Sequence, residues 1–378
     1  MSRGGLVTAG IALAACRGTL PATEIVVTVD TTFGVPCTID ALHIEATGDG
    51  AAMPVEVMPL DADALPGSIT LVPRGNPRDV TVTVTGMRAG SVFATARGTA
   101  SFEHETSLEL RFILDRSCIP GPCPAVGVGG YAELPDPQPR RGCGEHGYSW
   151  KNALFTVRDA CVMREAGMGS VVPGVDEKEA LSPLLPAMPF PFWFYGAPVT
   201  KVWAGVNGYI GLGDTMPNAL KGSVGAARSL GEVGFPGKGV LAFWDDLRTG
   251  PAGVCFTLSG QFPDRILWIT WKEACFASLD DTPCGAPDRG SLTFGIALEE
   301  TTDRIYLGYG TMTATDINRA KGNNATIGVT DAAMRGCKAM LCSTSGVCQD
   351  GAGTPCGYTQ FSSMTAQMPF PTLEFDPR

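Results

Sequence analysis

The sequence lacks the short motifs that mark common classes of enzyme and metal site. No His-Glu-x-x-His, Gly-x-Ser-x-Gly or Cys-x-x-Cys spacing occurs in the chain. These absences argue against a zinc peptidase, a hydrolase with a nucleophile elbow, and a zinc ribbon or thioredoxin-like site. Histidine is scarce too, since His43, His104 and His146 are the three present and none lies near a nucleophile signature. We therefore expect no catalytic activity and assign no catalytic residue.

Basic residues and long helical patterns are also few. The 28 Lys and Arg are outnumbered by 38 Asp and Glu, which gives a net charge of −10. Binding to phosphate backbones requires a basic patch, so we expect no nucleic-acid partner. Short apolar runs, separated by many of the 48 Gly and 29 Pro, favour strands joined by turns. The chain is predicted to be all-β, with two β-sandwich domains and one short helix at 175–185, whose early residues are acidic.

Thirteen cysteines without zinc-type spacing indicate an oxidising compartment. Cys16 has a separate role, described below. The other twelve are an even set that we expect to be disulfide-bonded, with a connectivity that spacing does not reveal: Cys37, Cys118, Cys123, Cys143, Cys161, Cys255, Cys275, Cys284, Cys337, Cys342, Cys348 and Cys356. Segment 337–356 is Cys-rich and buries little apolar surface, so crosslinks are expected to order it; a metal site is the alternative.

Residues 1–16 resemble a bacterial lipoprotein signal peptide. Arg3 precedes an apolar stretch at 6–15, which is too short to span a bilayer core of about 30 Å as a helix. The stretch leads into Leu-Ala-Ala-Cys ending at Cys16, which resembles a lipobox, so Cys16 is expected to carry acyl chains that anchor the protein in the membrane. A plain secretory signal with an ordinary cysteine is the alternative. Arg17, in place of aspartate, favours the outer membrane or cell surface.

Residues 24–116 are predicted to form a small immunoglobulin-like or fibronectin-like sandwich. Val80, Val82 and Val84 are separated by threonines, and apolar residues alternate again between Leu108 and Leu114, as in strands with one buried face. About seven such segments fit that fold. Residues 117–146, rich in Cys and Pro, are predicted to be a semi-rigid linker. A larger jelly-roll-like sandwich is expected over 147–378.

A β-hairpin at 190–213 is expected to organise the second domain. Asn207 and Gly208 separate two runs of aromatic and β-branched residues. Asn-Gly is typical of a two-residue type I′ turn, in which both residues have positive φ.

Aromatic segments around this hairpin follow one another in a fixed order. Phe-Pro-Phe-Trp-Phe-Tyr-Gly at 190–196 precedes it, and Phe-Trp-Asp-Asp-Leu at 243–247, Ile-Thr-Trp at 269–271, Thr-Phe-Gly-Ile-Ala-Leu-Glu at 293–299 and Ile-Tyr-Leu-Gly-Tyr-Gly at 305–310 come after it. In this order they resemble the nidogen-like β-sandwich of extracellular matrix and bacterial surface proteins, over about 186–330. The resemblance implies an extracellular location and an interaction role, and it carries over no catalytic residue.

Asp245 and Asp246 are the best polar candidates outside these packing residues. Two carboxylates at a strand end could contribute oxygen ligands to Ca²⁺, or they could accept hydrogen bonds from turn amides, which we favour. His104, between two glutamates, could join a metal site or simply be solvated, and His43 should point outward from its strand. No cofactor is expected beyond this candidate for calcium.

Two further features bear on carbohydrate chemistry. Glu299 could be one member of a glycosidase carboxylate pair, but Glu300 faces the opposite side of the strand, so a partner would come from elsewhere. The tryptophans of the aromatic segments either form a sugar-stacking platform or, as we favour, belong to the core: Trp193, Trp203, Trp244, Trp268 and Trp271.

The sequence is compatible with two functions. The leading one is a lipid-anchored cell-surface binding or adhesion protein whose ligand is a surface protein or a glycan. The alternative is a secreted carbohydrate-binding module, or an accessory of a glycoside hydrolase, on a jelly-roll scaffold.

Overall fold

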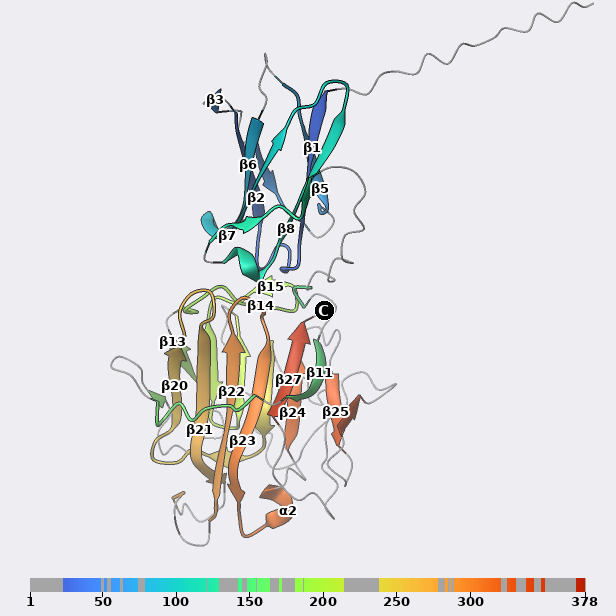
Figure 1. Cartoon of the computed structure of the whole chain (residues 1–378). Helices are drawn as coiled ribbons and strands as arrows, with labels where there is room; N and C mark the ends of the chain where they lie inside the picture. The colour runs from blue at the N-terminus through green and yellow to red at the C-terminus, as the bar shows by residue number, and fades with distance from the viewer. Residues whose placement is uncertain are drawn as a thin grey trace, which may run out of the picture.

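A computed structural model of the chain shows an all-β protein in which two β-sandwiches are stacked end to end (Figure 1). The structure describes residues 23–48, 51–52, 56–61, 64–73, 79–119, 121–128, 142–144, 148–153, 155–163, 170–171, 181–185, 187–213, 238–277, 283–284, 286, 289–320, 325–330, 338–342, 348–350 and 372–377.

The first domain packs two sheets face to face. One has the order β3 (Ala51–Ala52), β2 (Ala41–Gly48), β6 (Asp79–Arg88), β7 (Ser91–Ser101) and β9 (Cys123–Pro124), with β4 (Glu56–Pro59) also paired to β2. The other has the order β10 (Gly127–Val128), β8 (Ser107–Leu114), β1 (Glu24–Thr31) and β5 (Gly67–Leu71). Val80, Val82 and Val84 are buried while the threonines between them are half-exposed, which confirms the predicted alternation.

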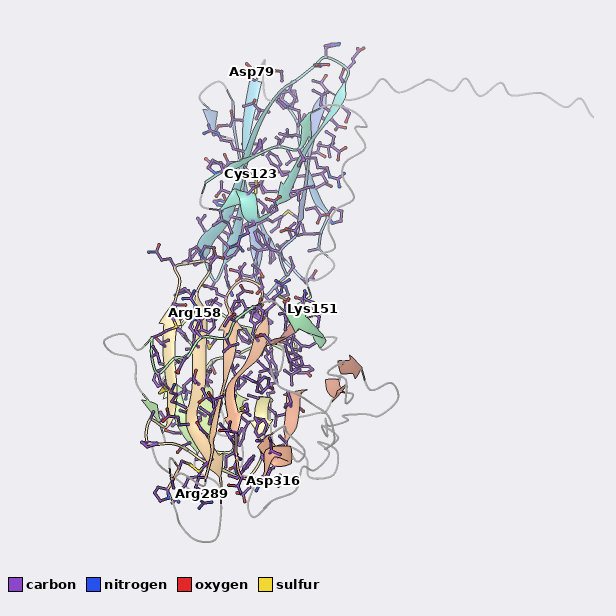
Figure 2. All side chains as sticks on the ribbon, turned by 60° about the horizontal axis from the view of Figure 1, so that its bottom comes forward. Asp79, Cys123, Lys151, Arg158, Arg289 and Asp316 are labelled. Atoms are coloured by element: carbon purple, nitrogen blue, oxygen red, sulfur yellow. A yellow bond between two sulfur atoms is a disulfide. The ribbon has the colours of Figure 1, made fainter. Side chains whose placement is uncertain are left out.

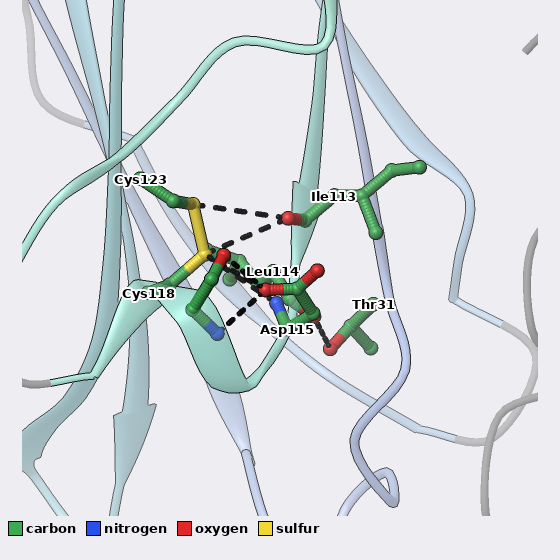
Figure 3. The surroundings of a disulfide bond; sticks show 7 residues. Thr31, Ile113, Leu114, Asp115, Cys118 and Cys123 are labelled. Atoms are coloured by element: carbon green, nitrogen blue, oxygen red, sulfur yellow. Dashed lines mark hydrogen bonds between the residues drawn. A yellow bond between two sulfur atoms is a disulfide. The ribbon is translucent and has the colours of Figure 1, made fainter.

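The first sandwich extends into the segment predicted to be a linker. After β8 the chain forms a 3₁₀ turn, η1 (Arg116–Cys118), and then β9 pairs in parallel with β7 and β10 pairs with β8. The reason is local crosslinking: the Cys118–Cys123 disulfide closes a short loop beside the end of β8 (Figure 3). Asp115 caps the turn by accepting the Ser117 amide at 2.8 Å.

The second domain also packs two sheets. The sheet nearest the viewer in Figure 1, called the front sheet, has the order β11 (Tyr148–Ala153), β27 (Thr372–Pro377), β23 (Ile305–Thr313), β22 (Ser291–Glu299), β21 (Ile266–Phe276), β20 (Val254–Ser259) and β12 (Ser170–Val171), with β19 (Leu247–Arg248) beside β21. The back sheet has the order β13 (Leu181–Leu185), β16 (Val202–Gly205), β17 (Tyr209–Leu212), β18 (Gly239–Trp244), β24 (Thr326–Thr330), β25 (Lys338–Cys342) and β26 (Cys348–Asp350).

Two short elements complete this domain. β14 (Trp193–Phe194) pairs with β15 (Ala197–Pro198) at the end that faces the first domain, and α2 (Ile317–Ala320) lies at the opposite end (Figure 1). The expected helix at 175–185 is wrong in its second half, because 181–185 form β13 and pair with β16. Residues 175–180, which include the acidic residues that suggested a helix start, lie outside the described residues.

Side chains fill the space between the two sheets of each domain (Figure 2). In the second domain Trp271 stacks on Phe294, with ring centroids 5.2 Å apart and planes at 12°. The aromatic segment 190–196 contributes Phe190, Phe192 and Phe194 to the same core, each at most 3% exposed. The aromatic residues that carry the family resemblance are therefore largely packing residues.

The predicted hairpin forms between β16 and β17, but its turn is not type I′. Gly205 pairs with Tyr209, which leaves a three-residue loop, and within that loop Gly208 has a positive φ, +79°. A three-residue loop commonly combines a type I turn with a residue in the left-handed region. Gly208 is required for a second reason, since its carbonyl accepts the amides of Ala242 and Phe243 and a Cβ would collide with the Phe243 carbonyl.

Among the described residues, four disulfides are present: Cys37–Cys143, Cys118–Cys123, Cys161–Cys255 and Cys275–Cys284. They pair eight of the twelve cysteines that we expected to be bonded, and they indicate an extracellular or secreted protein. Cys342 and Cys348 are register partners in β25 and β26. Cys16, Cys337 and Cys356 lie outside the described residues.

The close approach of Gly208 to the Phe243 carbonyl predicts that Gly208→Ala lowers the free energy of unfolding by at least about 2 kcal/mol. A side chain in the left-handed region costs about 1–2 kcal/mol, and overpacking against Phe243 adds about 1–3 kcal/mol. Gly90→Ala is the matched control, because Gly90 has φ +78° and open space around its Cβ position. Urea unfolding measures both. Equal losses for the two variants would show that the contact with Phe243 contributes nothing.

Candidate functional site

Asp245, the first of the two carboxylates singled out in the sequence, is held by a cation. Its side chain is 1% exposed, and the Arg319 guanidinium of α2 donates to both of its oxygens, with Nη2–Oδ1 at 2.7 Å and Nε–Oδ2 at 3.1 Å. The Asp246 amide donates to Asp245 Oδ1 at 2.7 Å. Asp245 thus accepts a turn amide, as we favoured, and also pairs with an arginine that the sequence did not reveal.

Other contacts tie this cluster to the hairpin. Asn207 Oδ1 accepts the Leu247 amide at 2.9 Å, and the Arg319 guanidinium lies 4.2 Å from the centre of the Phe276 ring. The hairpin loop, the end of β18 and α2 are therefore joined by polar contacts at one end of the domain. In the part of the chain that is described, no group of three or more His, Cys, Asp or Glu side chains is arranged to hold a metal ion.

A second polar cluster lies on the outer face of the front sheet. The register places Trp268, Ala297, Tyr306, Glu374 and Lys151 directly opposite one another across β21, β22, β23, β27 and β11. Because directly paired residues share one face of a sheet, these side chains form a row from an aromatic end to a charged end. The sequence could not predict the row, because its members come from strands far apart in the chain.

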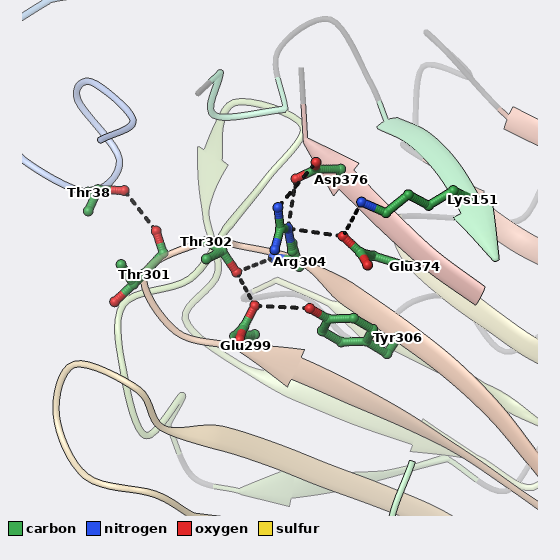
Figure 4. A network of polar contacts seen from close by, with 9 residues as sticks. All are labelled: Thr38, Lys151, Glu299, Thr301, Thr302, Arg304, Tyr306, Glu374 and Asp376. Atoms are coloured by element: carbon green, nitrogen blue, oxygen red, sulfur yellow. Dashed lines mark hydrogen bonds and ion pairs between the residues drawn. The ribbon is translucent and has the colours of Figure 1, made fainter. Parts of the chain in front are cut away.

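The charged end of the row is a network of paired groups (Figure 4). Tyr306 donates from its hydroxyl to Glu299 Oε2 at 3.2 Å. Arg304 Nε lies 2.9 Å from Asp376 Oδ1 and 3.2 Å from Glu374 Oε1, and Lys151 Nζ lies 3.1 Å from the same glutamate oxygen. Glu374 is thus a second carboxylate of this network, contributed by a strand that the sequence could not place here, and it is paired with two cations.

Burial and charge fix the protonation states in this network. Burial raises the pKa of the Tyr306 phenol, and the negative charges of Glu299 and Glu374 raise it further. Burial alone would lower the pKa of the Arg304 guanidinium, but its hydrogen bond to Asp376 and the neighbouring carboxylates outweigh burial and raise it. Tyr306 therefore remains a neutral donor and Arg304 a cation, so the network is suited to holding the sheet together.

The aromatic end of the row is covered by a strap, residues 155–163, which runs across the strands of the front sheet (Figure 1). Phe155 stacks on Tyr306 and Trp268, with ring centroids 4.0 and 5.5 Å apart. Lys272 Nζ pairs with Asp159 at 2.6 Å, and the Cys161–Cys255 disulfide fixes the end of the strap to β20. The outer aromatic surface is consequently occupied by the chain itself.

The five tryptophans do not form one sugar-stacking platform. Trp271 belongs to the core between the sheets, where its indole N–H donates to the Gly205 carbonyl at 2.9 Å. Trp268 lies on the opposite face of β21, beneath the strap, and is 2% exposed. Trp193, Trp203 and Trp244 are half-buried. This distribution matches the core role that we favoured for Trp268 and Trp271.

The two domains meet at a joint that includes the aromatic segment 190–196. Arg88 Nη2 at the end of β6 donates to the Pro191 carbonyl at 2.7 Å, and Thr38 Oγ1 donates to the Thr301 carbonyl at 3.1 Å. Phe93 packs edge-to-face against Phe262, with centroids 5.7 Å apart. The Cys37–Cys143 disulfide and a surface ion pair between Arg116 and Asp264 complete the set.

Arg88 is a buried charge within this joint. The residue is 7% exposed, and its Nε and Nη1 have no hydrogen-bond partner among the described residues. Burial lowers the pKa of its guanidinium, while the negative charges of Asp303 and Glu300 oppose that shift. Glu300 is itself paired with Arg265 through both carboxylate oxygens, each at 2.7 Å. The first domain therefore inserts a cation into an acidic end of the second.

The histidines have no metal-like surroundings where they are described. His43 is half-exposed on β2, as predicted. The His104 side chain is 87% exposed, with Nδ1 3.7 Å from Glu105. His146 lies outside the described residues. Among the described residues, no helix is both long and apolar enough to cross a bilayer.

Comparison with known families adds one match. A family model described as NIDO related matches residues 167–355, which is half of the chain and lies within the second domain. No curated protein and no solved structure matches the chain.

The Asp245 geometry predicts a strong coupling with Arg319. Removing one partner of a buried pair costs about 3 kcal/mol or more, so Asp245→Asn and Arg319→Gln should each destabilise the protein by that order and the double variant by little more. The exposed pair Arg116–Asp264, with side chains 67% and 53% exposed, is the control and should show a coupling of about 0–1 kcal/mol. Chemical denaturation provides the free energies.

The same variants test the calcium alternative. Added Ca²⁺ is expected to leave the melting temperature of the parent unchanged, because an arginine already neutralises Asp245. A rise of several degrees that Asp245→Asn abolishes would assign the carboxylate to calcium instead.

Proposed function

The chain belongs to the NIDO-related family, and from that premise we propose that it is a lipid-anchored cell-surface binding or adhesion protein without catalytic activity. The family match lies in the second domain, which we assign as the binding domain. The first domain is then a stalk between that domain and the membrane, which the acyl chains of Cys16 would enter.

The arrangement of the domains supports this assignment. β1 begins at the end of the first domain that faces away from the second domain, and the chain reaches the joint only after β1 (Figure 1). An anchor that precedes β1 would therefore present the second domain on the far side of the first. Each domain contains at least one internal disulfide, which suits an extracellular position.

The state of the carboxylates supports binding without catalysis. A general acid or base has to lie within hydrogen-bond reach of the proton that it transfers to or from a substrate. Asp245, Glu300 and Glu374 are each paired with arginine, and Glu299 accepts from Tyr306. These pairs hold the carboxylates in structural roles, which suits a protein whose ligand is bound and released unchanged.

Cys16→Ser separates anchoring from binding in one experiment. The parent, expressed in a Gram-negative bacterium, should incorporate a radiolabelled acyl chain and stay with the membrane, and Cys16→Ser should be unlabelled because the thiol that receives the chain is missing. The purified Cys16→Ser protein is then applied to a glycan array and to biotinylated envelope proteins, where we expect saturable binding without cleavage of any glycan.

Two controls make the outcome decisive. Cys118→Ser with Cys123→Ser alters the first domain, and it should bind as the parent does if the second domain holds the ligand. Labelling that survives Cys16→Ser would contradict the anchor, and hydrolysis of an arrayed glycan would favour the carbohydrate-active alternative.

A further inference from the structure

Two cysteines that are bonded to each other flank the part of the first domain that follows β1. β1 runs toward the joint and ends at Thr31, and Cys37 follows six residues later. The disulfide connects Cys37 to Cys143 across 106 residues of sequence, with their Cα atoms 5.6 Å apart. Every strand of the first domain other than β1 lies inside the loop that this bond closes.

We propose that the Cys37–Cys143 disulfide is a covalent bypass that carries tension past the first domain. Tension applied ahead of β1 would pass along β1 to Cys37, cross the disulfide, and enter the second domain at Cys143. The loop from 38 to 142 would carry none of it. The direction of the load, from a membrane anchor to a ligand on the second domain, rests on the proposed function; the bypass itself rests on the connectivity.

Contacts on both sides of the disulfide connect it to the folded domains. Cys37 and Cys143 are each 2% exposed. The Gly196 amide donates to the Cys143 carbonyl at 3.1 Å, which ties the exit of the bypass to the aromatic segment of the second domain. Next to Cys37 in the chain, the Thr38 hydroxyl donates a hydrogen bond to the Thr301 carbonyl. The bypass thus leads into the packed end of the second domain.

The segment ahead of the bypass, β1, can lengthen only a little under tension. A β-strand already rises about 3.3 Å per residue, close to the limit of about 3.3–3.6 Å for a fully extended chain. Pulling β1 straight therefore adds little extension. The 106-residue loop, by contrast, would release roughly 350 Å if it were unfolded and drawn out, and the disulfide withholds that length.

Force spectroscopy tests this directly. The protein is made in an oxidising cytoplasm without residues 1–16, so that disulfides form while the export signal and the lipid acceptor are both absent, and it is held by tags at both ends. Complete unfolding of Cys37→Ser with Cys143→Ser should give a contour length roughly 350 Å longer than unfolding of the parent. Equal contour lengths would overturn the proposal.

Cys118→Ser with Cys123→Ser is the matched control. It also removes two cysteines from this part of the chain, but its loop lies inside the bypassed segment, so its contour length should equal that of the parent. If it lengthens as the joint variant does, the Cys37–Cys143 bond does not by itself withhold the loop, and the bypass is wrong.

A measurement on the parent covers the case in which the joint variant does not fold. The parent is fully extended and held at constant force, and a thiol reductant is added. Cleavage of Cys37–Cys143 should appear as a step of roughly 350 Å, longer than the step of roughly 310 Å expected from Cys161–Cys255, which closes 94 residues. The joint variant should keep the shorter step and lack the longer one. Absence of such a step from the parent would contradict the bypass, whether or not the protein binds a ligand or a membrane.

Discussion

Contacts across the joint between the two domains determine how the two sandwiches are placed relative to each other. Interfaces between domains of one chain often permit relative motion. Here a disulfide, a buried arginine and an aromatic pair cross the boundary together, at Cys37, Arg88 and Phe93. Because Arg88 is buried beside Asp303 and Glu300, separating the domains would expose an acidic surface and a cation that are matched to each other.

Paired charges recur through the second domain and limit what its chemistry can be. Arg265, Arg304 and Arg319 each contact carboxylates of residues that the fold brings close. Removing one partner of such a pair leaves an uncompensated charge in a poorly solvated site. Their arrangement is therefore a structural requirement of this sandwich.

Local patterns predicted much of the fold because strands are specified by residues near one another. The alternation around Val82 fixed which face of β6 is buried, and Asn-Gly located the hairpin. The turn type was mispredicted because it depends on where strand pairing stops: Gly205 pairs with Tyr209, which itself pairs with Leu241 of β18. β9 and β10 were missed because two-residue strands have no period to detect.

The polar sites were less predictable, since their partners are distant in sequence. Asp245 and Arg319 are 74 residues apart, and the sequence carries no local sign that α2 folds back onto β18. The same holds for Glu374, which meets Arg304 only when β27 joins β23. The strap was missed because 155–163 form no strand, yet Phe155 covers Tyr306.

The contacts across the joint are expected to hold the two sandwiches in one fixed orientation. Spin labels on noncanonical residues at Val57 and Val162, which are 63% and 76% exposed in the first and second domains, leave the disulfides intact and report the distance between domains. Pulsed electron paramagnetic resonance should give one narrow distance distribution for the parent and a broad one when Arg88→Ala is combined with Cys37→Ser and Cys143→Ser. A broad distribution in the oxidised parent would contradict the account.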